Sequence, residues 1–208
     1  MMLKWFAVAC VVMMNGSLAL AQDGGAPRND LPQPYRTTRD WGRLPASITA
    51  WPAVTGVEVA PDGTIYVSNM ADNGIQAVNP STGAVRQLTR GAVAVPGGIK
   101  VDGNTLWLAD IFSFRKVDLT TGQVTDVKRS HAVDSDIEYP FSVGMGSKHL
   151  ALSSWFTGTV QLIDRASGKT TAMLHGFKAP YDAIPMDDGS LLVAEIATGS
   201  ITRASGDS

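Results

Sequence analysis

Polar side chains that carry oxygen atoms recur at one position of a repeating pattern in this 208-residue sequence. Each follows a short apolar segment, and the four are Asn69, Asp110, Ser154 and Glu195. A fifth, Asp182, lies just after a proline that opens the last pattern. Ca²⁺ and Mg²⁺ prefer carboxylate, amide and carbonyl oxygens, so Asn69, Asp110, Asp182 and Glu195 are candidate ligands of a divalent cation. The alternative is structural, because such side chains at a strand end also cap the following turn.

The polar segment 129–141 contains the histidine best suited to proton transfer. Its ionisable residues include His131, Asp134, Asp136 and Glu138. Imidazole titrates near neutral pH, so His131 is a candidate general acid or base above a bound cation. A solvated acidic loop is the alternative. Zinc is disfavoured, because imidazole-rich zinc sites need about three converging histidines and His149 is expected at the opposite end of the sheets.

Aromatic residues follow two of the polar positions. Trp155 and Tyr181, with Ser154, are candidate substrate-binding residues, and Phe156 could extend the same apolar wall. The alternative for these rings is packing between sheets, which is expected for Trp107, Phe112 and Phe114. No glycine-rich segment matches a phosphate-binding loop, so no nucleotide cofactor is expected, and the serines lack a nucleophile elbow.

An internal repeat gives these residues a common location. Four units open at Pro52, Pro96, Pro140 and Pro180, with intervals of 44, 44 and 40 residues. In the first unit, hairpin signals at Asp62-Gly63 and Thr82-Gly83 separate runs of alternating apolar residues that predict four strands: Val57–Val59, Ile65–Val67, Ile75–Val78 and Ala84–Leu88. Units of about 40 to 45 residues with four short antiparallel strands predict an all-β fold, the β-propeller. A β-sandwich is the alternative, but it does not require the pattern to recur in register.

The propeller prediction places the polar positions at one opening. In a four-stranded blade, the start of the first strand and the end of the second lie at the same end of the sheet. The residues expected to surround that opening are Thr55, Asn69, Gly98, Asp110, Ser142, Ser154, Asp182 and Glu195.

The repeat over residues 35–208 resembles a known family. Its motifs are Pro-x-x-[Val/Ile], Asp-Gly, [Ile/Leu]-[Tyr/Trp]-Val-x-[Asn/Asp], Ile-x-x-[Val/Ile]-[Asn/Asp] and Thr-Gly. They are similar to the NHL-type repeat that the regucalcin/gluconolactonase, virginiamycin B lyase and peptidyl-hydroxyglycine lyase propellers share. The resemblance implies a divalent cation, Ca²⁺ or Mg²⁺, that polarises a substrate carbonyl, with Asn69, Asp110, Asp182 and Glu195 as the residues that could hold it. The glutamate that the family usually has near the start of the first inner strand lacks a clear counterpart, since Glu58 lies in mid-strand.

Two functions follow from this resemblance. The first is metal-assisted hydrolysis of, or elimination from, a lactone or ester, with His131 as the proton carrier. The second is a non-catalytic module whose loops bind a protein, peptide or glycan. Propellers of this family usually have six blades, whereas the sequence supplies three complete units and part of a fourth. A fragment of a longer propeller is therefore expected, and a four-bladed ring completed by residues 36–51 is the alternative.

The amino-terminal residues predict export. Residues 1–21 combine Lys4, an apolar run and the small-residue site Ala19-Leu20-Ala21. Residues 22–34 are expected to be a flexible leader, and residues 35–208 the propeller domain. The apolar run is shorter than the ~20 residues of a membrane span, so a periplasmic or secreted location is expected. Cys10, the single cysteine, lies inside the signal.

Charge argues against nucleic acid as a partner. The sequence has 17 basic and 19 acidic residues and a net charge of −2. It therefore lacks the basic field that a phosphate backbone requires. A small-molecule substrate or a protein or glycan ligand remains, and the sequence leaves the oligomeric state open.

Overall fold

The computed structural model describes residues 53–129 and 136–205, and all of them belong to one compact unit. These residues form fifteen β-strands and no helix. None of the described segments therefore has the long apolar helix that a membrane crossing needs. The predicted signal and leader, residues 1–21 and 22–34, lie outside the described residues, as do His131 and Asp134.

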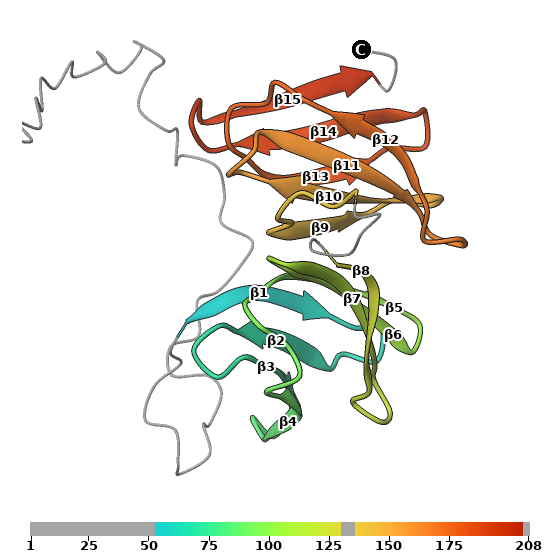
Figure 1. Cartoon of the computed structure of the whole chain (residues 1–208). Helices are drawn as coiled ribbons and strands as arrows, with labels where there is room; N and C mark the ends of the chain where they lie inside the picture. Colours follow the sequence, from blue (N-terminus) through green and yellow to red (C-terminus); the bar gives the residue numbers. More distant parts are fainter. Residues whose placement is uncertain (1–52, 130–135, 206–208) are drawn as a thin grey trace, which may run out of the picture. The chain divides into compact units, whose positions relative to one another are not determined.

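The strands form four antiparallel sheets in sequence order, coloured from cyan to red in Figure 1. Blade 1 consists of β1 (Val54–Val59), β2 (Ile65–Asn69), β3 (Gly74–Val78) and β4 (Val85–Arg90). Blade 2 consists of β5 (Pro96–Asp102), β6 (Thr105–Asp110), β7 (Ser113–Asp118) and β8 (Val124–Arg129). Blade 3 consists of β9 (Ser142–Met145), β10 (His149–Ser154), β11 (Thr159–Asp164) and β12 (Thr170–Leu174). Blade 4 has three described strands, β13 (Pro180–Pro185), β14 (Ser190–Glu195) and β15 (Ser200–Ser205).

The predicted hairpin turns are present, and their side chains explain why they form. Gly63 and Gly83 have φ angles of +85° and +69°, which glycine adopts without a steric penalty. In the turn between β7 and β8, Asp118 Oδ1 accepts hydrogen bonds from the backbone N–H groups of Thr120 (3.0 Å) and Thr121 (2.7 Å). Such bonds satisfy the turn backbone and direct the chain into the next strand.

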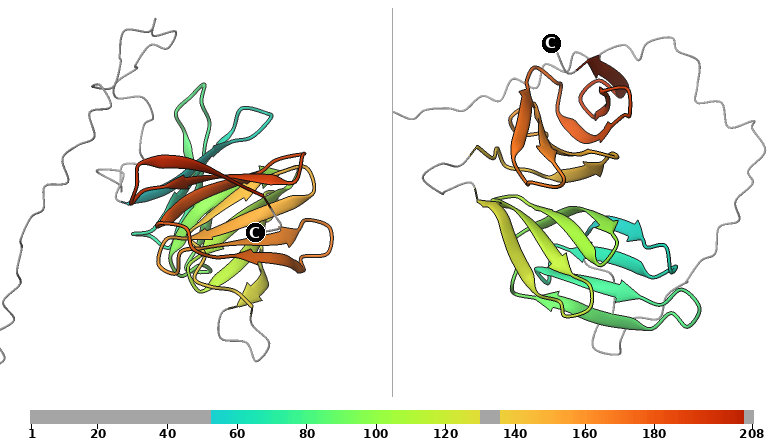
Figure 2. Two further views of the ribbon diagram at one scale, coloured as in Figure 1. Left: turned by 90° about the horizontal axis from the view of Figure 1, so that it is seen from above. Right: turned by 90° about the vertical axis from the view of Figure 1, so that its right-hand side faces the viewer.

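The four sheets pack face to face through three hydrophobic clusters, which excludes the sandwich and confirms the propeller. The first strands contact one another in the order β1, β5, β9 and β13, and Figure 2 shows the sheets from two further sides. Blade 1 packs on blade 2 around Ile75 and Leu108, blade 2 on blade 3 around Phe114 and Leu150, and blade 3 on blade 4 around Val160. Each sheet is too thin to bury both its faces alone, so neighbouring blades provide the core.

Candidate functional site

Strand pairing confirms that the predicted polar positions are equivalent. Asn69, Asp110 and Glu195 each pair with the first residue of β1, β5 and β13, respectively. Ser154 ends β10 in the same way and pairs with Thr159 on β11. We call this end of the blades the entry end, because the first strand of each blade begins there.

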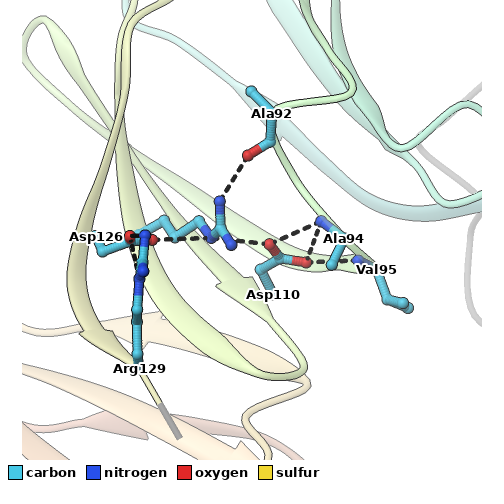
Figure 3. A network of polar contacts seen from close by, with 7 residues as sticks. Ala92, Ala94, Val95, Asp110, Asp126 and Arg129 are labelled. Atoms are coloured by element: carbon cyan, nitrogen blue, oxygen red, sulfur yellow. Dashed lines mark hydrogen bonds and ion pairs between the residues drawn. The ribbon is translucent and has the colours of Figure 1, made fainter. Parts of the chain in front are cut away.

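The carboxylate of Asp110 binds the loop that leads into its own blade (Figure 3). Its oxygens accept hydrogen bonds from Ala94 N (3.1 and 3.0 Å) and Val95 N (2.6 Å). The guanidinium of Arg115, on the neighbouring strand β7, lies 2.9 Å from Asp110 Oδ2 and 3.2 Å from Asp126 Oδ1. The Asp110 side chain is fully buried, so this ion pair and the two amide groups compensate the charge that burial would otherwise penalise.

Blade 4 repeats this arrangement with different residues. Glu195 accepts hydrogen bonds from Thr202 Oγ1 and from the backbone N–H of Lys178, which precedes β13. The Thr202 hydroxyl and then the Lys178 amide hold the pKa of Glu195 below its ordinary value of 4.5. The third-strand residues Arg115 and Thr202 are equivalent, because β7 and β15 pair with the preceding strand in the same register.

Blades 1 and 3 carry neutral residues at the same positions. Asn69 Oδ1 accepts from Ala71 N (3.1 Å), and Asn69 Nδ2 donates to Asp72 (3.1 Å), which caps the turn into β3. In blade 3, Ser154 Oγ and Gln161 Oε1 are buried and make no hydrogen bond within the described residues. Gln161 Nε2 donates to Asp136 O and to Thr170 Oγ1, each at 2.8 Å.

Asp182 differs from the other acids in its bonding. Its Oδ1 accepts hydrogen bonds from Ser142 Oγ of blade 3 and from Ala183 N, each at 3.0 Å. Its second carboxylate oxygen accepts none from the described residues, and its side chain is half-buried. Of the three predicted acidic ligands, Asp182 is therefore the one with a carboxylate oxygen that the described residues leave unused, since both oxygens of Asp110 and Glu195 accept hydrogen bonds.

These acids do not form a compact cluster. No hydrogen bond or ion pair joins any two of Asn69, Asp110, Asp182 and Glu195. Within residues 53–129 and 136–205, no three His, Cys, Asp or Glu side chains are grouped as a metal site. The described part of the chain thus offers no complete carboxylate cage, and the predicted cation stays a prediction, as does the role of His131.

Two further acids serve the junctions between blades. Glu58 Oε2 lies 2.9 Å from Lys100 Nζ, which links blades 1 and 2, so Glu58 occupies a blade interface. Asp136 pairs with Lys128 Nζ at 2.7 Å and accepts from the Thr170 hydroxyl. Burial raises the pKa of Asp136, but the hydrogen bonds from Lys128 and Thr170 outweigh it, so the pKa lies below its ordinary value.

Aromatic side chains form the most distinctive surface of the entry end. We define this aromatic surface as Phe112, Tyr139, Phe141, Trp155, Phe156 and Tyr181. Trp155 and Phe156 stack with their ring centroids 3.9 Å apart, and Phe141 contacts both Trp155 (6.2 Å) and Tyr181 (5.5 Å). Phe112 meets Tyr139 edge-on at 6.2 Å. Except for the half-buried Phe141, every ring of the set is exposed.

Sequence reasoning predicts part of this surface. It places Trp155, Phe156 and Tyr181 in an apolar wall, but it places Phe112 between blades, which is wrong, because Phe112 is 42% exposed. Trp107 and Phe114 do pack there, stacked at 5.4 Å. The repeat itself contains the missing signal, because Ile111-Phe112 follows Asp110 as Trp155-Phe156 follows Ser154. The contributions of Tyr139 and Phe141 depend on the path of the loop before β9.

Comparison with known proteins supports the β-propeller fold but assigns neither a family nor a function. No family model and no curated protein matches the sequence. Among solved structures, virginiamycin B lyase from Staphylococcus aureus is 17% identical with a TM-score of 0.57, over 73% of this chain and 55% of that one. A chain of the nidogen/laminin complex is 19% identical with a TM-score of 0.53, over 62% of this chain and 49% of that one. The computationally designed Ika4 protein is 11% identical with a TM-score of 0.57, over 81% of this chain and 99% of that one.

These likenesses are to β-propellers, and at such identities they show the fold alone. The chain spans about half the length of the first two natural proteins, 55% and 49%. A shared propeller fold supports many unrelated functions. The function must therefore be argued from the entry end itself.

Proposed function

We propose that this propeller binds an apolar ligand that bears an aromatic group, and that the aromatic surface is its binding site. The observation that carries the proposal is the stacked pair Trp155 and Phe156, which remain 38% and 54% exposed. Large aromatic side chains normally bury most of their area. A contiguous set left open to solvent is characteristic of a ligand or partner site.

The shape and lining of the surface support a small or narrow ligand. A hollow of about 310 Å³ lies between Phe156 and the pair Phe112 and Tyr139. Its volume is at the low end of the roughly 300–1,000 Å³ usual for ligand pockets. Its lining residues are Ile111, Phe112, Tyr139, Phe156 and Thr157. Because this lining is apolar, it offers few of the directed hydrogen bonds that a glycan needs. An aromatic amide, a peptide segment or a similar organic molecule fits it better.

Binding of model ligands tests the proposal. N-acetyl-L-tryptophanamide and maltotriose are each titrated into the ¹⁵N-labelled chain, with amide chemical shifts as the readout. We expect the tryptophanamide to shift resonances of residues 111–112, 139–141 and 155–157, and maltotriose to bind at least tenfold more weakly. The Trp155→Ala/Phe156→Ala variant should lose at least tenfold in affinity.

A matched control separates this site from other exposed apolar residues. Met186 is 41% exposed in the turn between β13 and β14, at the opposite end of the blade. Met186→Ala should leave the affinity unchanged. Equal losses in both variants, or shifts spread over the whole surface, would refute a site on the aromatic surface.

A second proposal keeps the activity that the sequence resemblance implies, metal-assisted hydrolysis or elimination on a lactone or ester. The observation in its favour is Asp182, whose second carboxylate oxygen is not used within the described residues and which adjoins Tyr181 of the aromatic surface. Asp182 would contribute one ligand to Ca²⁺ or Mg²⁺, and the ion would polarise the carbonyl. Asn69, Asp110 and Glu195 would have to give up turn or loop contacts to join it.

Thermal unfolding with added cations tests this second proposal. A cation that binds only the folded chain raises the Tm by mass action. If Asp182 is a ligand, Ca²⁺ or Mg²⁺ should raise the Tm, and Asp182→Asn should abolish the rise. If neither ion raises the Tm, the cation proposal is refuted and only the proposal of an aromatic ligand stands. We also propose that the chain is exported and that its signal, residues 1–21, is removed. Sequencing the amino terminus of the mature protein would test cleavage after Ala21.

A further inference from the structure

Three aromatic side chains form the walls of the hollow in the aromatic surface. Phe112 and Phe156 each lie two residues beyond the end of the second strand, in the neighbouring blades 2 and 3. Tyr139 comes from the loop that leads into β9, and all three residues line the hollow. Blades 1 and 4 have Ala71 and Ala197 at the position of the two phenylalanines. Among the described blades, the rings therefore gather where blades 2 and 3 meet.

The arrangement of these rings leaves aromatic surface open toward a ligand. The planes of Phe112 and Tyr139 are 76° apart, so the two rings form walls that meet at nearly a right angle. Trp155 stacks on one face of Phe156, with the two planes 28° apart. Because Phe156 lines the hollow and Trp155 does not, the hollow borders Phe156 on the side that Trp155 leaves open.

Rings set around an apolar hollow suit one kind of polar group in particular. The face of an aromatic ring is the negative side of its quadrupole, and it attracts a cation that lies over it. A primary ammonium also needs acceptors for its three N–H groups, which an apolar lining does not supply. A quaternary ammonium has no N–H group, and its methyl groups can pack directly against the rings. The hollow therefore favours a quaternary ammonium over a primary amine.

The charges around the hollow also favour a cation. Glu138 directly precedes Tyr139, is half-buried, and takes part in no hydrogen bond or ion pair with the described residues. The basic side chains of β7 and β8 at the entry end are each paired with an acid: Arg115 with Asp110, Lys128 with Asp136 and Arg129 with Asp126. The described residues of this junction therefore leave one carboxylate, that of Glu138, without a compensating cation at the entry end.

We propose that the hollow binds a quaternary ammonium group, with Phe112, Tyr139 and Phe156 as the cation–π contacts and Glu138 as the counter-charge. This inference rests on the proposed function, because it assigns a second chemical group to the ligand of the aromatic surface. The other rings of that surface, Phe141, Trp155 and Tyr181, remain available to the aromatic group of the same ligand.

A pair of ligands with the same shape and different charge tests the proposal. Choline and its uncharged isostere, 3,3-dimethyl-1-butanol, are each titrated into the ¹⁵N-labelled full chain. We expect choline to shift the amide resonances of residues 111–112, 139–141 and 155–157, and to bind at least about fivefold more tightly than the alcohol. Phe156→Leu and Tyr139→Leu keep an apolar wall but remove an aromatic face. Each should weaken choline at least about threefold and change the affinity of the alcohol by less than about twofold.

A charge variant and a matched control test the contribution of Glu138. Glu138→Gln should weaken choline and reduce the dependence of its affinity on ionic strength, because salt screens the lost attraction. Asp187→Asn removes an equal charge from the exposed turn between β13 and β14, at the opposite end of the blades. This control should leave both the affinity and its salt dependence unchanged.

The outcomes separate this inference from the proposed function. Equal affinities for choline and the alcohol, or leucine variants that weaken both ligands alike, would overturn the quaternary ammonium site. If N-acetyl-L-tryptophanamide still binds the aromatic surface in that case, the proposed function stands without this inference. If choline binds with the expected preference and the tryptophanamide does not bind, the ammonium site stands and the aromatic group of the proposed ligand is refuted.

Discussion

Asp110 and Arg115 form an ion pair across β6 and β7, with Arg115 Nε 2.9 Å from Asp110 Oδ2 and the Asp110 side chain fully buried. The same carboxylate holds the backbone of Ala94 and Val95. One buried charge thus fixes both the end of the second strand and the loop that leads into the first. Asp110 is therefore both a candidate site residue and part of the contacts that hold its blade together.

Removing either charge of this pair should destabilise the chain. Breaking a buried pair leaves the partner uncompensated, which typically costs about 3–5 kcal/mol. Asp126 still faces Arg115 at 3.2 Å, so we expect a smaller loss of about 2–3 kcal/mol for Asp110→Asn, measured by urea unfolding. Arg115→Gln introduces the side chain that blades 1 and 3 have at this position, Gln76 and Gln161, and should cost a similar amount.

The double variant separates pairing from packing. If the charges interact, Asp110→Asn/Arg115→Gln should cost at least about 1 kcal/mol less than the sum of the single variants. The surface pair of Arg203 and Asp188 provides the control, and Arg203→Gln should cost under about 0.5 kcal/mol. Strict additivity would show that Asp110 stabilises only through the loop amides.

The sequence predicts the blades well because its turn chemistry is local. Asp62-Gly63 and Thr82-Gly83 determine where the chain reverses, and the alternation of apolar residues determines which side of each strand is buried. Register then follows from the turns. The equivalence of Asn69, Asp110, Ser154 and Glu195 could therefore be predicted before any coordinates.

The chemistry at those positions could not be predicted in the same way. Arg115 occupies an alternating strand and resembles an ordinary surface cation, yet the exit carboxylate of β6 draws it inward. Side-chain oxygens at a strand end can bind a cation or accept hydrogen bonds from the amides of the preceding loop. The local sequence is compatible with both roles. The exposure of Phe112 likewise depends on how the loops of blades 2 and 3 meet, which is a long-range property.

Acid should reveal the contribution of Glu195. Its folded-state pKa lies below 4.5 because of Thr202 and the Lys178 amide, so its stabilising effect is present above pH 4.5 and is lost as the pH falls through the lowered value. The difference in unfolding free energy between the unmodified chain and Glu195→Gln should be largest at pH 7 and should shrink below pH 4.5.

A second variant identifies the cause of the Glu195 shift. Thr202→Val removes the largest contribution but keeps the carboxylate, so the acid-dependent loss of stability should move toward pH 4.5. Asp118, Asp164 and Asp188 also have lowered pKa values, because side-chain hydroxyls and backbone amides in their turns donate to them. Both Thr202→Val and the unmodified chain contain these three residues, so their contributions to the pH dependence cancel when the two chains are compared. A difference that does not change with pH would contradict the assigned role of Glu195.

Two turn glycines of blade 2 distinguish backbone conformation from packing between blades. Gly103 and Gly122 have φ angles of +57° and +74°, so alanine at either position pays the left-handed penalty of about 1–2 kcal/mol. A Cβ at Gly103 meets nothing within 4 Å, whereas one at Gly122 would overlap the Leu88 carbonyl oxygen of blade 1. Gly122→Ala should therefore cost at least about 1 kcal/mol more than Gly103→Ala in urea unfolding. Equal costs would mean that the β7–β8 turn does not press on blade 1, and that blade packing there tolerates a methyl group.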